Sequence, residues 1–180
     1  MGIDAWRWAS RLLVVFRMGI KRPPRVARFD YVGLRAYFLT ICTFQRVRWF
    51  EDDECAKQVM SEFLRTADAY GFATVAYCLM PDHVHALVEA TRLDSDFLRF
   101  VVMFKQRTAY AQTGKLWQEG FFDRILRDGD DLLPVAAYIV ANPVRARLCD
   151  SPTAYPHLGS SRYTLEQLCE AIQMGTTSRP

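Results

Sequence analysis

Two of the chain's three histidines, His83 and His85, stand two positions apart on either side of Val84. The segment that contains them, HVHALVEA, follows a proline–aspartate turn and is predicted to be a β-strand. Because side chains alternate between the faces of a strand, both imidazoles should point one way and Val84 the other. Two imidazoles side by side on a sheet face form a natural site for a divalent metal ion. Taken alone, however, the spacing favours a chance pair of surface histidines over a metal site.

A second pair of polar residues lies in the segment AAYIVANPVRARL, where Asn142 follows Tyr138 by four positions. Residues four apart on a helix share a face, so the phenol and the carboxamide should project together. The helix is predicted over residues 131–141, with a stop at Asn142, because a proline disfavours helical backbone in the residue before it. Taken alone, Tyr138 would be a core tyrosine and Asn142 a helix stop. The third histidine, His157, is predicted to be an ordinary surface residue of a Tyr-Pro-His-Leu loop.

Together these segments resemble those of the HUH endonucleases. CLMPDHVHALVEA is most similar to the Met-Pro-x-His-Val-His strand of the REP-associated tyrosine transposases, relatives of the small single-tyrosine insertion-sequence transposases. AAYIVANPVRARL resembles the Tyr-Ile-x-x-Asn-Pro-Val-x-Ala helix of that family, and FKQRTAY and LWQEGFFDRILRD are also similar to it. The resemblance covers residues 37–148. It departs at Arg147, where family members commonly have a glycine, and the departure concerns the local backbone turn.

The resemblance implies that His83 and His85 bind a metal ion, Mg²⁺ or Mn²⁺, and that Tyr138 is the nucleophile. It also implies that Asn142 is a third metal ligand, and an amide oxygen suits these hard cations. The implied reaction is cleavage and rejoining of single-stranded DNA, recognised as a hairpin of the REP type, through a 5′-phosphotyrosine link. A tyrosine hydroxyl is a weak nucleophile, with an unperturbed pKa of about 10, so it needs a cation beside the phosphate. The protein would be a monomer or a homodimer.

Three alternatives stay open. A domesticated regulator would keep the fold and bind DNA without cleaving it, although all four implied active-site positions are present. A metal-dependent hydrolase would use water and would stay active after Tyr138→Phe. A ferredoxin-like RNA-binding module would bind without metal and without the histidine pair. Within the transposase interpretation, Tyr110 is a rival nucleophile, but Gly114 stands four positions after it and offers no amide side chain.

Basic and aromatic residues in the second half of the chain are predicted to contact DNA, because cations meet phosphates and aromatic faces stack on unpaired bases. Trp117 is equally compatible with a place in the core, and Glu89 and Asp123 could lie near the metal. The DNA-contact candidates are Lys105, Arg107, Tyr110, Lys115, Trp117, Phe121, Arg124, Arg127, Arg145 and Arg147.

The elements that must position these residues alternate along the chain. Residues 36–50 are rich in aromatic and β-branched residues and are predicted to form a strand. Residues 51–71 carry apolar residues at helical spacing, with an acidic start and Gly71 at the end, as is typical of a helix. Residues 72–80 and 83–90 are predicted to form an antiparallel hairpin.

A helix over residues 94–112, a strand over 121–126, the Tyr138 helix and a last amphipathic stretch over 165–172 complete the order. The first six elements match the ferredoxin-like split βαβ order. The sequence therefore predicts an α+β fold: a ferredoxin-like antiparallel sheet with helices packed on one face, plus a C-terminal helix that carries the tyrosine.

The composition permits a nucleic-acid partner without requiring one, since the net charge is only +3. No apolar run approaches the roughly 18 residues of a membrane span, and no secretory signal is visible. We therefore expect a cytoplasmic protein with no membrane partner. The five cysteines include no CxxC pair, which argues against a zinc ribbon or a disulfide framework.

Three segments are predicted. Residues 1–30 are basic, rich in tryptophan and interrupted by Pro23 and Pro24, so they form an extension that is either disordered or a short helix, or they precede a true start at Met18. Residues 31–150 form the domain that the resemblance describes. Residues 151–180 form a C-terminal tail.

Overall fold

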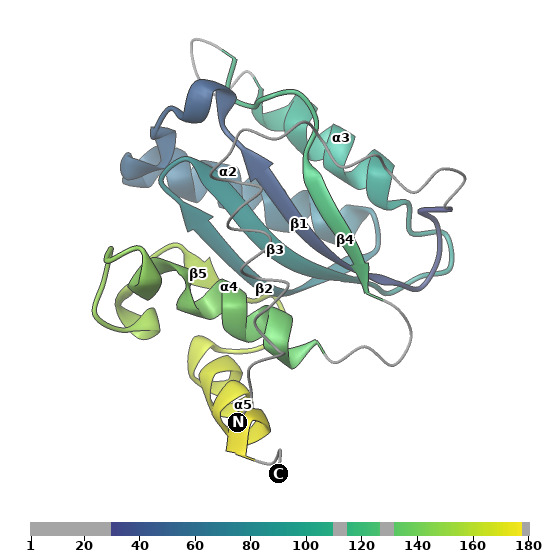
Figure 1. The fold of residues 1–180 in the computed structure, drawn as a ribbon. Helices are drawn as coiled ribbons and strands as arrows, with labels where there is room; N and C mark the ends of the chain where they lie inside the picture. The colour runs from purple at the N-terminus through teal and green to yellow at the C-terminus, as the bar shows by residue number, and fades with distance from the viewer. Residues whose placement is uncertain (1–29, 110–114, 127–131, 178–180) are drawn as a thin grey trace.

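The computed structural model describes residues 30–109, 115–126 and 132–177 (Figure 1). Within these residues, five strands form one antiparallel sheet in the order β4-β1-β3-β2-β5. The first four strands in chain order pair as in a ferredoxin-like fold, and a short fifth strand, which was not predicted, extends the sheet beside β2. The predicted N-terminal extension, Tyr110 and Arg127 lie outside the described residues. The strands are β1 (Ala36–Cys42), β2 (Phe72–Met80), β3 (His83–Ala90), β4 (Phe122–Leu126) and β5 (Leu158–Gly159).

Helices cover both faces of the sheet (Figure 1). α2 (Asp53–Ala69) and α3 (Phe97–Thr108) pack on one face, as the split βαβ order predicts. α4 (Leu133–Arg145) packs on the other face, and α5 (Leu165–Thr177) packs against α4. The predicted fold class is confirmed, with the tyrosine helix on the face opposite the other two. None of the helices among the described residues combines the length and the hydrophobicity that crossing a membrane requires.

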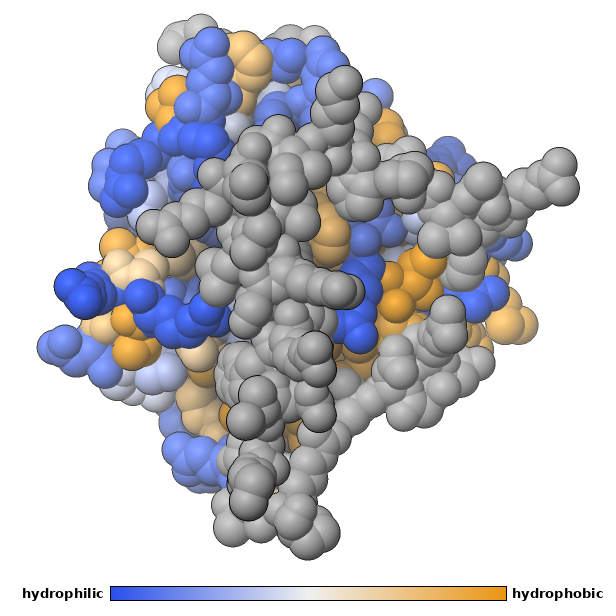
Figure 2. Space-filling view, viewed as in Figure 1, coloured by the Kyte–Doolittle hydropathy of each residue, from blue (hydrophilic) through white to orange (hydrophobic). Residues whose placement is uncertain are grey.

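Alternation along the strands divides the buried side chains into two cores. In β1, Tyr37 and Leu39 join the core under α2 and α3, whereas Phe38 joins the core under α4. In β3, Val84 lies in the first core, so His83 and His85 face α4, as predicted from the period of two. The metal candidates therefore share the face that carries the tyrosine helix. On the described part of the surface in Figure 2, hydrophilic and hydrophobic residues are interspersed.

The first strand is shorter than its composition predicts, because it ends at Cys42 rather than at residue 50. The backbone N–H groups of Thr43 and Phe44 leave the sheet and donate to the carbonyls of Asp82 and Leu116. A short 3-10 turn, η2 (Phe44–Arg46), follows in place of a strand. Aromatic and β-branched composition cannot reveal such tertiary hydrogen bonds, so the prediction failed here.

The helix that carries Tyr138 also differs from its prediction, because Pro143 does not stop it. α4 continues to Arg145, and the carbonyls of Asn142 and Pro143 accept hydrogen bonds from Ala146 and Leu148. A proline removes its own N–H from the helical ladder, and its ring crowds the carbonyl of the residue four positions earlier. Burial of Ile139, Asn142 and Pro143 against the sheet keeps the last turn helical despite that loss.

Arg147 occupies the position where the family commonly has glycine, and its backbone is left-handed, with φ at +58°. It directly follows Ala146, the C-terminal cap residue of α4. Glycine is favoured at this position of a helix end because it has no Cβ to penalise a left-handed backbone. The turn is thus the one that a glycine would make, and this chain makes it with an arginine.

Candidate metal and tyrosine site

The two imidazoles converge on one point. The Nε2 atoms of His83 and His85 lie 3.0 Å apart, with the ring planes nearly perpendicular at 86°. Each Nδ1 atom has a partner on the far side of its ring. His83 Nδ1 lies 2.6 Å from Asp82 Oδ1, and His85 Nδ1 lies 2.8 Å from Thr40 Oγ1. Hydrogen bonding at Nδ1 leaves Nε2 as the atom directed toward a ligand, which is the usual arrangement of metal-binding histidines.

The β1–β3 pairing explains why these groups meet. Thr40 is the cross-strand partner of His85, so their side chains stand next to each other on the same sheet face. The ring of Phe38 stacks on His85 with centroids 5.6 Å apart and fixes its plane. Asp82 lies in the two-residue turn before His83, and its other carboxylate oxygen lies 2.7 Å from Arg46 Nε. One carboxylate thus joins a guanidinium to the first histidine.

The protonation of this cluster suits a metal site. Burial lowers the pKa of His83, although the hydrogen bond to Asp82 opposes that effect. Burial lowers the pKa of His85 well below its usual value, and neighbouring His83, Arg46 and Arg145 lower it further. Burial raises the pKa of Asp82, but the hydrogen bond to His83 and the nearby charges outweigh it and leave the pKa lowered. Near neutral pH, both imidazoles are therefore neutral, the form that binds cations.

The geometry fits a divalent ion held by two histidines. Two ligands at about 2.1 Å from an octahedral ion, at right angles to each other, lie about 3.0 Å apart. The observed distance between the two Nε2 atoms is 3.0 Å. In residues 30–109, 115–126 and 132–177, no group of three His, Cys, Asp or Glu side chains could hold a metal ion. The carboxamide of Asn142, which was predicted as a third ligand, is of another chemical type and stays a prediction.

Tyr138 lies beside the histidine pair. Its ring centroid is 5.7 Å from that of His85 and 5.9 Å from that of Phe38, edge-on in both cases. The guanidinium of Arg145 lies 5.3 Å from the ring centroid of Tyr138. The residue is only 2% exposed, and burial raises the pKa of its phenol while Arg145 lowers it in part. The strand of the metal candidates and the helix of the nucleophile candidate are thus in contact.

Asn142 is buried one helical turn after Tyr138, and its Nδ2 donates to the Tyr138 carbonyl at 2.9 Å. This bond directs the amide nitrogen along the helix. Asn142 as a metal ligand remains a prediction.

Three of the predicted DNA contacts lie elsewhere in the fold. Trp117 is 4% exposed in the core, where its Nε1 donates to Thr108, so its ring faces are not available to a base. Lys105 donates to the carbonyls of Gln118 and Gly120 and fastens that loop to α3. Arg107 pairs with α2 on the sheet face away from the histidines, 3.5 Å from Glu62 and 3.1 Å from Thr66.

The other described candidates lie closer to the site or on the surface. Arg124 stands opposite Phe38 in the β1–β4 pairing, so it shares the sheet face of the histidines. Arg145 and Arg147 are exposed at the end of α4. Lys115 is exposed, 4.9 Å above the ring of Phe44. Of the two predicted acidic neighbours, Glu89 pairs with Arg162 at the far end of β3.

A comparison with known families assigns the chain. The profile of the family described as "Transposase IS200 like" matches residues 32–142, more than half of the sequence. The chain belongs to this transposase family. The matched range includes His83, His85, Tyr138 and Asn142.

Individual relatives agree with that assignment. A Haemophilus influenzae protein named as a REP-associated tyrosine transposase is 28% identical over 134 residues, a match that covers 66% of this chain and 75% of that protein. A solved structure of a REP-associated tyrosine transposase bound to a REP hairpin superposes with a TM-score of 0.63. It is 20% identical and covers 73% of this chain and 79% of its own, so it supports the fold. The resemblance to REP-associated tyrosine transposases is confirmed.

Reasoning from the sequence missed three residues of this transposase's candidate site. Asp82 was interpreted only as a turn residue, although an acidic residue directly before His83 was a usable signal. Thr40 could not be found, because its contact with His85 depends on the register of two strands that lie far apart in sequence. Arg46 fell inside a segment predicted to be a strand.

Proposed function

We propose that this transposase cleaves and rejoins single-stranded DNA through a 5′-phosphotyrosine intermediate on Tyr138, in a reaction that depends on Mg²⁺ or Mn²⁺. The substrate would be DNA that folds into a palindromic hairpin of the REP type. The observation that supports this proposal best is the contact of Tyr138 with His85, because it brings a nucleophile to a pair of convergent imidazoles. The relative that was solved with a REP hairpin supports the choice of DNA.

In this scheme, His83 and His85 hold the ion through Nε2, and Asn142 supplies the third ligand. The bound ion would polarise the scissile phosphate and stabilise the negative charge that develops on it. In this scheme, the hydrogen bonds at Nδ1 with Asp82 and Thr40 favour the tautomer in which Nε2 carries no proton, and they orient each ring so that Nε2 faces the ion. Phe38 keeps the plane of His85 fixed. Each contact reduces the reorganisation that the site would otherwise need during the reaction.

The phenol of Tyr138 would be the nucleophile of the reaction. Its oxygen forms a bond to phosphorus as the bond from phosphorus to the 3′-oxygen breaks, and the phenolic proton is lost as the 3′-oxygen gains one. The product is a 5′-phosphotyrosine with a separate 3′-hydroxyl. A 3′-hydroxyl can then attack the same phosphorus and release the tyrosine, so ends can be rejoined without another energy source.

The site is closed in this structure. Tyr138 is 2% exposed and His85 is 3% exposed. A phosphate can therefore reach them only if the residues that cover them move. Helix α4 contacts the sheet through apolar side chains rather than through strand hydrogen bonds, and such a contact can shift as a unit.

The proposal is tested by incubating the protein with Mn²⁺ and 3′-labelled single-stranded DNA that folds into a REP hairpin. We expect the label to become covalently attached to the wild-type protein, and to remain unattached when EDTA replaces Mn²⁺. Tyr138→Phe should form no adduct. The matched control Tyr163→Phe removes a half-exposed phenol outside the site and should behave as wild type.

Other outcomes identify the alternatives. Cleavage by Tyr138→Phe would indicate a hydrolase that uses water. Hairpin binding with no adduct from the wild-type protein would indicate a DNA-binding regulator.

A further inference from the structure

The loop after β1 has an unusual backbone. Gln45 and Arg46 are consecutive non-glycine residues in the left-handed region, with φ at +53° and +59°. Residues other than glycine rarely adopt this backbone conformation, so tertiary contacts must hold it. Thr43 supplies them: it is fully buried, its N–H donates to the Asp82 carbonyl, and its Oγ1 lies 2.7 Å from the Val47 carbonyl. The loop is thereby fastened to the turn that precedes His83.

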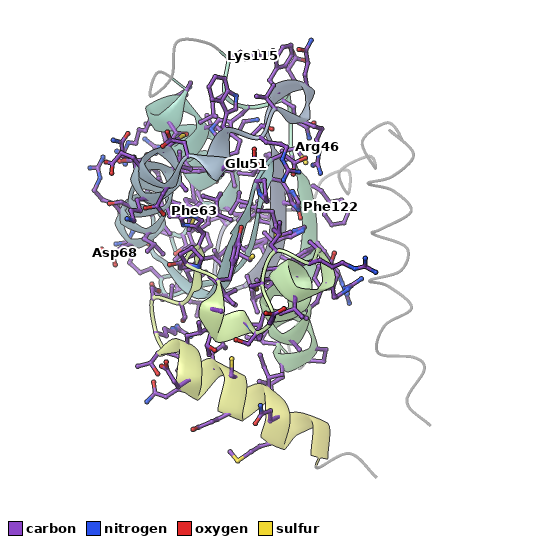
Figure 3. The ribbon with its side chains drawn as sticks, turned by 90° about the vertical axis from the view of Figure 1, so that its left-hand side faces the viewer. Arg46, Glu51, Phe63, Asp68, Lys115 and Phe122 are labelled. Atoms are coloured by element: carbon purple, nitrogen blue, oxygen red, sulfur yellow. The ribbon has the colours of Figure 1, made fainter. Side chains whose placement is uncertain are left out.

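The strained backbone directs Arg46 toward the histidine pair. Its Nε lies 2.7 Å from Asp82 Oδ2, and its Nη1 lies 2.6 Å from Cys42 Sγ. Asp82 Oδ1 in turn lies 2.6 Å from His83 Nδ1, so one carboxylate separates the guanidinium from the imidazole. Cys42 is the cross-strand partner of His83, which brings the guanidinium over the same end of the sheet face. In Figure 3, Arg46 lies at the end of the molecule where Lys115 projects, far from Asp68.

Arg46 also remains accessible. Its side chain is 43% exposed, whereas the Asp82 side chain that fixes it is only 18% exposed. A guanidinium has five N–H donors in a planar fork that matches two oxygens of a phosphate. The contacts with Asp82 and Cys42 fix the plane of this fork through Nε and Nη1. A positioned cation is therefore present beside the metal candidates, on the side that solvent can reach.

From this geometry we infer that Arg46 binds the phosphate that is cleaved, beside the ion held by His83 and His85. The inference rests on the proposed cleavage reaction and adds to it a residue that donates to a non-bridging phosphate oxygen. Its positive charge stabilises the negative charge that develops on those oxygens as Tyr138 attacks. Asp82 has two functions in this arrangement, since it orients both His83 and Arg46.

Arg48 provides a matched control two positions later in the same loop. Its Nε and Nη2 bind Glu51 at 2.9 and 2.8 Å, and its side chain is 56% exposed. It carries the same charge as Arg46, but its guanidinium is bonded to Glu51 rather than to the turn or to the strand of the histidines. A general effect of loop charge on DNA affinity would therefore appear in both variants, and a contact with the cleaved phosphate in only one.

The first test measures the rate of adduct formation with REP-hairpin DNA, Mn²⁺ and saturating protein. Arg46→Ala should slow the reaction by about 100- to 1000-fold, the usual effect of removing one donor to a developing oxyanion. Arg48→Ala should stay within about threefold of wild type, since exposed charges contribute little. Arg46→Lys should recover part of the rate, because it keeps the charge and loses the fork. If wild type forms adduct and Arg46→Ala matches its rate, the inference is wrong and the proposed function stands; if wild type forms none, both fail.

The second test separates phosphate contact from a structural role. Binding is measured in the Tyr138→Phe background, with DNA that carries either the normal phosphate or a neutral methylphosphonate at the mapped cleavage position. With Arg46 present, the methylphosphonate should weaken binding by about tenfold or more, and with Arg46→Ala by less than about threefold. The Arg48→Ala variant should keep the full penalty. Equal penalties with and without Arg46 would show that Arg46 supports the loop and does not contact the phosphate.

Discussion

The ring of Tyr138 lies edge-on to the imidazole of His85, with the centroids 5.7 Å apart and the planes at 70°. A strand of the sheet and a helix from a later part of the chain thus bring a phenol and two convergent imidazoles into one cluster. Neither element contains the cluster alone.

The first prediction concerns the metal ligands. His83→Ala should weaken Mn²⁺ binding by more than about 100-fold, because losing a ligand should cost more than losing an outer-shell partner. Isothermal titration calorimetry measures the affinity. His157→Ala is the matched control, since His157 pairs with Asp53 at 3.4 Å in another part of the molecule, and it should bind Mn²⁺ as wild type does. Equal affinities of wild type and His83→Ala would remove His83 from the metal site.

A second prediction concerns Asp82, which orients His83 without being a proposed ligand. Asp82→Asn keeps the size of the side chain and removes the charge that holds His83 Nδ1–H. Affinity for Mn²⁺ should fall by about 10- to 100-fold, the usual effect of changing an outer-shell partner. The circular dichroism spectrum should be unchanged. An unaltered affinity would mean that the carboxylate serves the turn and not the histidine.

Replacing Arg147 with glycine, the residue that the family commonly has at this position, should stabilise the protein. Its left-handed backbone costs an L-residue about 1 kcal/mol, which glycine avoids. Arg147→Gly should therefore raise the free energy of unfolding by roughly 0.5–1 kcal/mol in urea denaturation, after the entropy that glycine adds to the unfolded chain. Arg147→Ala keeps the Cβ and should show no such gain. A destabilised glycine variant would indicate that the arginine side chain supports the turn.

Two of the predicted DNA contacts can now be told apart by their place in the fold. Arg145 is exposed beside Tyr138, whereas Arg107 is paired with α2 on the opposite sheet face. Arg145→Ala should weaken hairpin binding and reduce the slope of log affinity against log salt by about one. Arg107→Ala should leave that slope unchanged. Fluorescence anisotropy over a series of salt concentrations measures both, and equal slopes for the two variants would contradict this assignment.

Much of this fold could be predicted from local patterns. The period of two placed His83 and His85 on one face and Val84 on the other, and the acidic start and Gly71 marked both ends of α2. These features depend on neighbours in sequence, and the structure confirms them. The stop predicted at Asn142 was wrong because burial of that turn outweighs the preference imposed by Pro143.

The support around the histidines could not be predicted in the same way. Thr40 reaches His85 only because β1 and β3 pair in one register, and a shift of one residue would point Thr40 to the other face. Arg46 reaches Asp82 because Gln45 and Arg46 adopt left-handed backbone conformations, which no residue type in the segment TFQRVR predicts. The buried position of Trp117 could not be predicted either, since a tryptophan among basic residues suits a DNA-binding surface and a core equally well.

Locating the link between protein and DNA shows whether Tyr138 is the nucleophile. The protein is incubated with hairpin DNA and Mn²⁺, the adduct is digested with nuclease and trypsin, and the modified peptide is sequenced by mass spectrometry. We expect a nucleotide attached through phosphate to Tyr138. A nucleotide on Tyr110 or on any other residue would contradict it, as would cleaved DNA with no protein-linked nucleotide.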